Sequence, residues 1–349
     1  MPLLTQYFTP RELTGYARTA LRDYPLNNPS LARWLPFNTV DATEFRFTRG
    51  DNGLIPLANF RAYDAESQIA GRKGVSRVTQ SLPPISIKKV LGEYDQLIQF
   101  QNPDSQIQTE ILKDVDDLVL RIGMSFEKEA AEALDLGTTT PPGLPETVDW
   151  QRSAGNSVTA NVYWSNTGSS DPISDLKTWA KYYRQKNGVP PGTILMSEDS
   201  LSYMLDSLAI RSLAGNIIGV PTMIDEGTLG QILSKNRLPP IETYEVTYDS
   251  KGKGDPADTR RILPNSSVLL LPAPTDPNTP AGTKLGATVL GTTVEARKPN
   301  YKLGDSRKGI VVGNYEDDDP AGIWTKANAI GMVQLMNPDL SFRATVGTY

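Results

Sequence analysis

The sequence predicts an α+β protein in which one long helix and a mixed helix–strand unit are joined by short β-strands. An apolar stripe runs unbroken through residues 104–136, which is typical of a helix. Strand and helix signals then alternate between residues 170 and 310. The 28 Gly and 27 Pro residues are spread along the chain and favour turns over further long helices. At 349 residues, the chain is long enough for two or three packed units.

Residues 1–40 are expected to form an extended arm without a core of its own. Only one short helical stretch, around Arg11–Leu21, is predicted in it, because proline removes a backbone donor and interrupts regular structure. The prolines that break the arm are Pro2, Pro10, Pro25, Pro29 and Pro36.

Residues 41–98 are expected to form a long two-stranded ribbon. Glu44–Arg49 alternates polar and apolar side chains, and the return strand is predicted at Val75–Val78 and Ile85–Lys88, with a charged, Gly-rich tip at Gly71–Gly74. A lone two-stranded ribbon is marginal in water, and ordering such a segment costs on the order of tens of kcal/mol of backbone entropy. We therefore expect another subunit to order it.

The helix predicted over residues 104–136 begins with Ser105 as its N-cap and Gln108 at capping-box spacing, and ends at Gly137. About 30 residues at 1.5 Å each give a rod of roughly 45 Å. One continuous face is apolar, at steps of three or four residues: Ile107, Ile111, Val115, Leu118, Ile122 and Phe126.

A second helix is predicted after a Thr-, Pro- and Gly-rich stretch. Asp171 is its expected N-cap and Pro172 its first residue. Its buried face is predicted at Ile173, Leu176, Ala180 and Tyr183. A strand at Thr193–Met196 and a helix capped by Ser197 follow, which indicates a mixed α+β unit.

The last 130 residues are expected to be mainly β-structure, with one short helix near Thr228–Leu233. The predicted strands are Ile241–Tyr248, Ser267–Leu271, Gly286–Ala296, Ile310–Val312, Ile330–Leu335 and Leu340–Val346, with a turn at Asn337–Asp339.

Histidine and cysteine are both absent from the chain, and this excludes whole classes of chemistry. Disulfides, Cys/His zinc sites and catalysis by Ser-His-Asp or Cys-His groups are impossible. The net charge of −5 and pI of about 5.1 lack the Lys/Arg surplus that neutralises phosphates. Because neither a signal peptide nor an apolar run of about 18 residues is present, we expect a soluble, intracellular protein with no membrane association.

The remaining motifs support no site. Glu316–Asp319 lacks the alternating pattern of calcium loops, and we interpret it as a solvated turn. Asp249–Asp255 carries two lysines where oxygen ligands are needed, and Arg49–Asp51 is interpreted as ordinary turn chemistry. The 40 acidic residues guarantee carboxylate pairs, but no spacing singles one out. We therefore expect no catalytic, cofactor-binding or metal-ligating residues, no cofactor, and a protein that is not an enzyme.

The order of parts resembles the Hong Kong 97-type shell protein, the major capsid fold of tailed double-stranded DNA bacteriophages. In detail, the second half is similar to the lambda-type major capsid proteins. The segments that carry this resemblance are Trp164–Asn166 leading into Asp171–Leu176, then Gly188–Ser197, Ile241–Asp249, Leu263–Asn265 and Val268–Pro272. The likeness covers most of residues 40–349.

The resemblance implies a division of the chain by its role in a shell. Residues 1–40 would be the N-terminal arm and 41–98 the extended loop. Residues 99–169 and 311–349 would form a peripheral domain with the spine helix at 104–136. Residues 170–310 would form an axial domain, where copies meet at the centres of hexamers and pentamers.

The resemblance also implies a function and partners. The chain would assemble with itself into hexamers and pentamers of an icosahedral head, made in the host cytoplasm and found in the virion. Scaffolding, portal and decoration proteins are further expected partners, and packaged double-stranded DNA would lie inside without sequence-specific contact. Because Arg11, Arg18, Arg22 and Arg33 outnumber the two acidic residues of the arm, we hypothesise that the arm faces the interior.

Alternative functions remain open at this point. An encapsulin-like cellular compartment would share the fold and would be revealed by a bound cargo. A decoration or tail protein would not form closed particles. A carboxylate-based hydrolase would be a monomer with turnover on some substrate.

Overall fold

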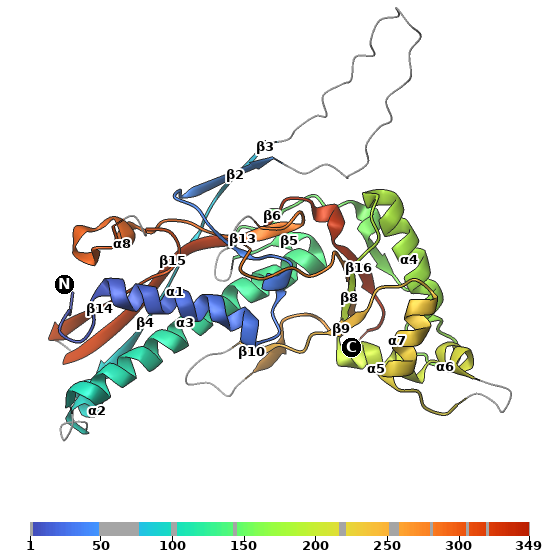
Figure 1. Ribbon diagram of the computed structural model, residues 1–349, viewed down its shortest axis with the longest axis horizontal. Coiled ribbons are helices and arrows are strands. Elements are labelled where there is room, and N and C mark those ends of the chain that lie inside the picture. Colours follow the sequence, from blue (N-terminus) through green and yellow to red (C-terminus); the bar gives the residue numbers. More distant parts are fainter. Residues whose placement is uncertain are drawn as a thin grey trace, which may run out of the picture.

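A computed structural model describes most of the chain. The molecule is elongated, and its two main β-sheets lie one after the other along its length (Figure 1). The described residues are 3–48, 77–98, 103–141, 145–215, 221–250, 258–279, 282–304, 307–318 and 321–348. None of the described helices is both long and apolar enough to cross a bilayer.

The first sheet is built around β15 (Ala321–Leu335), a strand of 15 residues. The first part of β15 pairs antiparallel with β14 (Val311–Asp318) and with β4 (Pro84–Gly92). Its last part pairs with β13 (Gly286–Leu290), and β1 (Phe37–Thr39) extends the sheet in parallel to β13. β4 and β13, which are both far from β15 in the sequence, therefore meet on this one strand.

Helix α3 (Pro103–Leu136) packs against this sheet and is 34 residues long. All six residues of the predicted apolar stripe are buried, which confirms its orientation. Gly137 follows the helix with a φ of +75°, a left-handed conformation that glycine adopts at little cost, as predicted. The predicted N-cap at Ser105 is wrong, because the helix begins at Pro103, where the missing N–H of proline removes no helical hydrogen bond.

Helix α1 (Pro10–Asn27) differs from the predicted arm, because it is longer than the expected stretch and belongs to the core. A capping box between Thr9 and Glu12 starts it, and Pro25 lies inside its last turn without ending it. A stripe at steps of four residues is buried against α3 and the sheet: Leu13, Ala17, Leu21 and Pro25. The arm therefore has a partner in its own chain.

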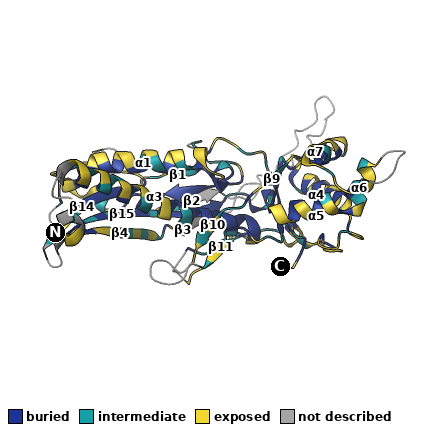
Figure 2. Ribbon diagram, turned by 90° about the horizontal axis from the view of Figure 1, so that it is seen from below, coloured by how far each residue is buried: buried dark blue, intermediate teal, exposed yellow. Residues whose placement is uncertain are grey.

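The second sheet has the strand order β7 (Ser157–Thr159), β16 (Phe342–Thr345), β12 (Ser267–Leu271), β8 (Thr193–Met196) and β9 (Ile241–Thr243). The central strand β12 is buried along its whole length. Four helices gather at this end of the molecule: α4 (Pro172–Asn187), α5 (Glu198–Asp206), α6 (Leu208–Ala214) and α7 (Glu226–Lys235) (Figures 1 and 2). We call this part the helical lobe.

The expected caps and buried face of the lobe helices are confirmed. Asp171 accepts a hydrogen bond from Ser174 N–H at the start of α4, and Pro172 is the first residue of this helix. Ser197 accepts from Ser200 N–H at the start of α5. The four predicted apolar positions of α4 are buried, and its Trp179 stacks on Trp164 with ring centroids 6.0 Å apart.

The remaining elements are short. They are α2 (Glu93–Ile98), α8 (Val294–Arg297), the strand pairs β5 (Thr138–Thr139) with β6 (Val148–Asp149) and β10 (Thr247–Asp249) with β11 (Thr259–Arg261), and 3-10 turns at Leu31–Arg33, Ala154–Asn156, Pro299–Tyr301 and Pro338–Leu340.

The predicted ribbon is confirmed at its base but not at its far boundary. β2 (Glu44–Thr48) pairs antiparallel with β3 (Arg77–Ser81). The stretch expected to complete the return strand, Ile85–Lys88, instead belongs to β4 and pairs with β15 in the first sheet. The tip at Gly71–Gly74 lies outside the described residues.

Several predicted strands have different bounds, and β14 and β15 are both longer than the strands expected at 310–312 and 330–335. The strand at 286–296 ends at Leu290, and α8 begins at Val294 because Thr293 caps it. The strand at 241–248 divides into β9 and β10, which belong to different sheets. β16 pairs with β12 in the second sheet, so the end of the chain returns to the helical lobe. β4 was expected in the extended loop and β13 in the axial domain, yet both pair with β15 of the expected peripheral domain. The division of the chain by role in a shell remains a prediction.

Candidate assembly surfaces

The ribbon of β2 and β3 is the first candidate surface, because among the described strands these two pair only with each other. At its base, Leu82 N–H donates to Thr43 O over 3.0 Å, and the partly buried Phe45 packs against the main core. The rest of the ribbon crosses above the body (Figure 1). Unpaired strand edges readily accept a strand from another chain through main-chain hydrogen bonds. The ribbon is therefore suited to contact a neighbour.

The end of the helical lobe is the second candidate surface. Met223 is 82% exposed and Leu213 is 57% exposed, and Leu208 lies on the same short helix as Leu213. This end is opposite to the β14–β15 hairpin along the long axis (Figure 2). Large apolar side chains that gather at an exposed end are typical of contact surfaces.

A buried carboxylate on α3 joins three segments of the interior that are far apart in the sequence. Glu127 accepts hydrogen bonds from Ser30 Oγ (2.9 Å), Leu31 N–H (2.6 Å) and Tyr244 Oη (2.8 Å). Burial raises the pKa of Glu127, and the hydrogen bonds that it accepts oppose this rise. The two carboxylate oxygens of Glu127 thus link the long helix to the segment after α1 and to the segment after β9.

The C-terminal end of α3 is held by a second polar cluster. Arg152 donates to the carbonyl oxygens of Leu134 (2.7 Å) and Asp135 (2.5 Å), which have no partner within the helix. Burial lowers the pKa of Arg152 to about 10. Arg343 of β16 lies 2.9 Å from Asp135 Oδ1, so the last strand is tied to the same helix end.

The turn at Asp339 completes this connection. Its carboxylate accepts from Ser153 N–H (2.9 Å), and its carbonyl oxygen accepts from the side-chain amides of Asn156 (2.8 Å) and Asn187 (2.9 Å). Asn187 ends α4, so the helical lobe is anchored to the region that follows α3.

Glu129 is the buried carboxylate that most clearly predicts a pH dependence. It accepts from Val333 N–H of β15 (3.1 Å), and burial raises its pKa to about 7. The folded chain therefore binds more protons at this group than the unfolded chain between about pH 4.5 and 7. Stability from this group is present at low pH and is lost as pH rises through this window. We expect the free energy of unfolding to fall by about 1 kcal/mol between pH 6 and 8 through this group.

The measurement is urea denaturation of the unassembled subunit at pH 6 and pH 8. Glu129→Gln is the matched control, because its amide oxygen can still accept from Val333 N–H but does not titrate in this range. The variant should lose about 1 kcal/mol of the pH dependence. The same pH dependence in both proteins contradicts this assignment.

These buried carboxylates were missed by sequence reasoning, although a signal exists. Glu129 follows Phe126 by three residues and lies on the continuation of the apolar stripe. A carboxylate at a stripe position indicates a buried acid that must be hydrogen-bonded. The partners of these two carboxylates cannot be read from the sequence, because Val333, which donates to Glu129, and Tyr244, which donates to Glu127, are each more than 100 residues away.

The arginines of the predicted arm are not all available to an interior surface. Arg33 forms an ion pair with Glu242 at 2.6 Å, and Arg18 Nε donates to Ile310 O over 3.1 Å. Arg11 and Arg22 are exposed. At least two of the four arginines therefore hold their own chain together, which weakens the charge argument for an arm that faces the interior.

The sequence motifs that were set aside as sites take part in strands or lie outside the described residues. Glu316, Asp317 and Asp318 continue β14 opposite Ile323, Gly322 and Ala321, so most of the acidic run is strand rather than turn. Arg49–Asp51 and residues 251–255 are outside the described part of the chain. Within the segments that the structure describes, no group of three or more acidic side chains could hold a metal ion.

Solved phage proteins share this architecture. A phage-related protein from Bordetella bronchiseptica RB50 superimposes with a TM-score of 0.60 at 14% identity, covering 96% of each chain. A protein described as the capsid protein of an Escherichia coli CFT073 prophage gives 0.63 at 13% identity, covering 97% of this chain and 99% of that one. The satellite phage P4 procapsid, which includes the size-determination protein, gives 0.50 at 9% identity over 99% and 93%. These likenesses show that the α+β fold is of the Hong Kong 97 type.

The family follows from the sequence comparison. No curated protein matches the chain significantly. The family described as phage major capsid protein E matches residues 21–346, which is nearly the whole chain. This chain therefore belongs to the phage major capsid protein E family.

Proposed function

We propose that the chain assembles with itself into hexamers and pentamers that close into the icosahedral head of a tailed phage, with double-stranded DNA inside. The observation that carries this proposal is membership of a major capsid protein family over residues 21–346. A capsid protein is structural, and its place is the virion capsid. The ribbon and the exposed end of the helical lobe supply two separate contact surfaces, which a head-to-tail ring requires.

The proposal extends to partners and to the place of assembly. Scaffolding, portal and decoration proteins would contact the shell, and assembly would take place in the host cytoplasm. The DNA would lie inside without sequence-specific contact, since a net charge of −5 disfavours tight phosphate binding. No catalytic activity is proposed, because the buried carboxylates Glu127 and Glu129 are engaged in hydrogen bonds that hold the fold.

The test is to express the chain with and without its genomic neighbours and to image the product by electron microscopy. We expect closed icosahedral particles, built from rings of five and six copies, in at least one of the two conditions. An encapsulin-like compartment would give particles that carry a cellular enzyme or cargo peptide. A compact monomer in all conditions, or one with hydrolytic turnover, contradicts the proposal.

A further inference from the structure

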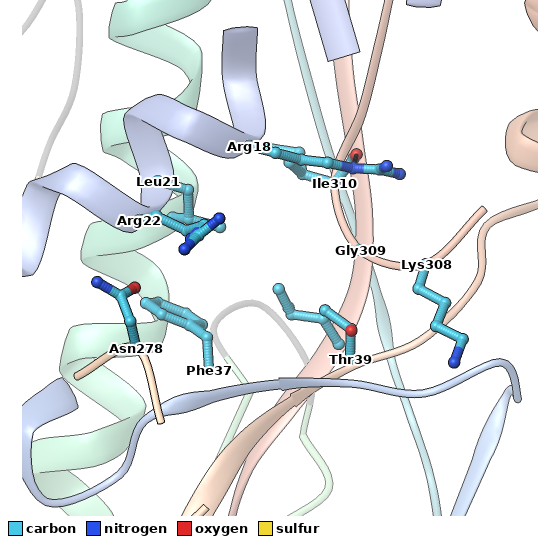
Figure 3. A pocket seen from close by; sticks show the side chains of 10 residues that line it. Arg18, Leu21, Arg22, Phe37, Thr39, Asn278, Lys308, Gly309 and Ile310 are labelled. Carbon is cyan, nitrogen blue, oxygen red and sulfur yellow. Dashed lines mark hydrogen bonds between the residues drawn. The ribbon is translucent and has the colours of Figure 1, made fainter. Parts of the chain in front are cut away.

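A pocket of about 630 Å³ lies between α1, β1 and the segment that leads into β14 (Figure 3). We call it the cationic pocket. The side chains that define it are Arg18, Arg22, Phe37, Thr39, Leu290 and Lys308. Arg18 and Arg22 project from α1 on one side and Lys308 extends from the other side, while Phe37 and Thr39 rise from β1 (Figure 3). The pocket therefore combines three cations with an apolar floor.

The charge of this pocket is opposite to that of the chain as a whole. The protein has 40 acidic and 35 basic residues, yet among the residues that the structure describes no carboxylate lines the pocket. Neither Arg22 nor Lys308 forms an ion pair with another residue in the described part of the chain, and both are exposed. Like charges that face one hollow repel each other, so an anionic occupant is favoured.

The same chain carries a complementary group at the far end of β14. Glu316, Asp317 and Asp318 end this strand, and Asp319 follows them in the sequence. We call residues 316–318 the acidic hairpin end. Glu316 is exposed and Asp317 is half-buried, and neither forms an ion pair with another described residue.

The acidic hairpin end cannot reach the cationic pocket of its own copy. Ile310 lines the pocket, and β14 runs away from it from Val311 to Asp318. Seven steps of about 3.3 Å place the end of the strand roughly 23 Å away. Because β14 is fixed along this length by pairing with β15, only a second copy can bring the two together.

We propose that the cationic pocket of one copy receives the acidic hairpin end of a neighbouring copy. This contact rests on the proposed self-assembly and adds a specific pair of surfaces to it. The two halves lie on different parts of the molecule, so the contact is head-to-tail and can repeat around a ring. Packaged DNA fits the pocket less well, because a phosphate backbone binds basic surfaces without requiring an apolar floor.

A charge-swap experiment on the full chain tests the proposal. Arg22→Glu with Lys308→Glu is expected to lower the assembled fraction about tenfold, because like charges then face each other across the interface. Glu316→Lys with Asp317→Lys should have a similar effect. All four changes in one chain should restore assembly to within about twofold of the wild type, because the pair is again complementary.

A matched control carries Lys177→Glu and Lys181→Glu on the exposed side of α4, which alters the net charge by the same amount. Adding Glu316→Lys and Asp317→Lys to this control should not restore any assembly that the control loses. Melting of each unassembled variant shows whether its subunit is folded, and Arg22→Gln with Lys308→Gln gives a milder pair of changes.

Three outcomes would overturn the inference. The first is unchanged assembly of Arg22→Glu with Lys308→Glu, and the second is a loss of assembly that Glu316→Lys with Asp317→Lys does not reverse. The third is normal particles that have lost only DNA retention, which would identify phosphate as the occupant. Wild-type particles in the same experiment keep the proposed function intact whichever outcome is found. A wild type that never assembles would instead remove the proposed function itself.

Discussion

Replacing residues 44–81 by a two-residue Asn-Gly turn is expected to leave a folded subunit that no longer forms closed particles. The deletion is geometrically simple, since Leu82 N–H already lies 3.0 Å from Thr43 O. β2 and β3 pair with each other and with no other described strand, so the two main sheets keep all their pairs. Melting should show a small loss of stability, mainly from Phe45, while electron microscopy should show no closed shells.

The matched control is Phe45→Ala in the full-length chain, which removes the apolar contact with the body but keeps the ribbon. This variant should lose about 1 kcal/mol of stability and still assemble. Two results contradict the account: an unfolded deletion variant beside a folded Phe45→Ala subunit, or closed particles without the ribbon.

Gly286→Ala is expected to destabilise the subunit by about 3 kcal/mol or more. An added Cβ at this position would lie 2.0 Å from the carbonyl oxygen of Gln334, well inside van der Waals contact. The backbone cannot easily shift, because β13 is paired with β15 on one side and with β1 on the other. Urea denaturation of the unassembled subunit measures the change.

Gly15→Ala is the control for Gly286→Ala. Gly15 lies within α1, and nothing approaches the position of an added Cβ within 4 Å. The substitution should stabilise the subunit by about 0.5–1 kcal/mol, because alanine is the better helix former. Equal stability of the two alanine variants would show that the contact between β13 and β15 is looser than described.

Local signals in the sequence predicted the helices α3 and α4 well. The stripe from Ile107 to Phe126, the Asp171 cap and Gly137 are all found in the expected roles. These predictions succeed because helix periodicity and capping depend on residues a few positions apart. The same reasoning placed the end of α1 too early, since the buried ring of Pro25 fits the last turn of this helix.

Strand partners could not be predicted in the same way. Ile85–Lys88 alternates like a ribbon strand, yet it pairs with β15 more than 230 residues later. An alternating pattern shows that one face of a strand is covered but not which strand lies beside it. For the same reason, the return of β16 to the second sheet was not expected.

The candidate surfaces were predicted in part. The marginal stability of a lone ribbon pointed to a neighbour, and β2 with β3 are indeed paired only with each other among the described strands. The expectation that the arm also depends on neighbours is wrong for α1. Thr14 Oγ1 donates to Val312 O and accepts from Val312 N–H, each over 3.1 Å, so the helix is fixed to its own sheet.

The central claim is that the body of the subunit is ordered by its own contacts, whereas the ribbon of β2 and β3 is ordered only by a neighbouring copy. Amide hydrogen exchange tests this claim most directly, measured on the unassembled subunit and on closed particles. We predict slow exchange of α1 and α3 in both states, and slow exchange of residues 44–48 and 77–81 only in particles. Ribbon amides that exchange as slowly as those of α3 in the lone subunit, or that remain fast in the closed shell, would contradict this claim.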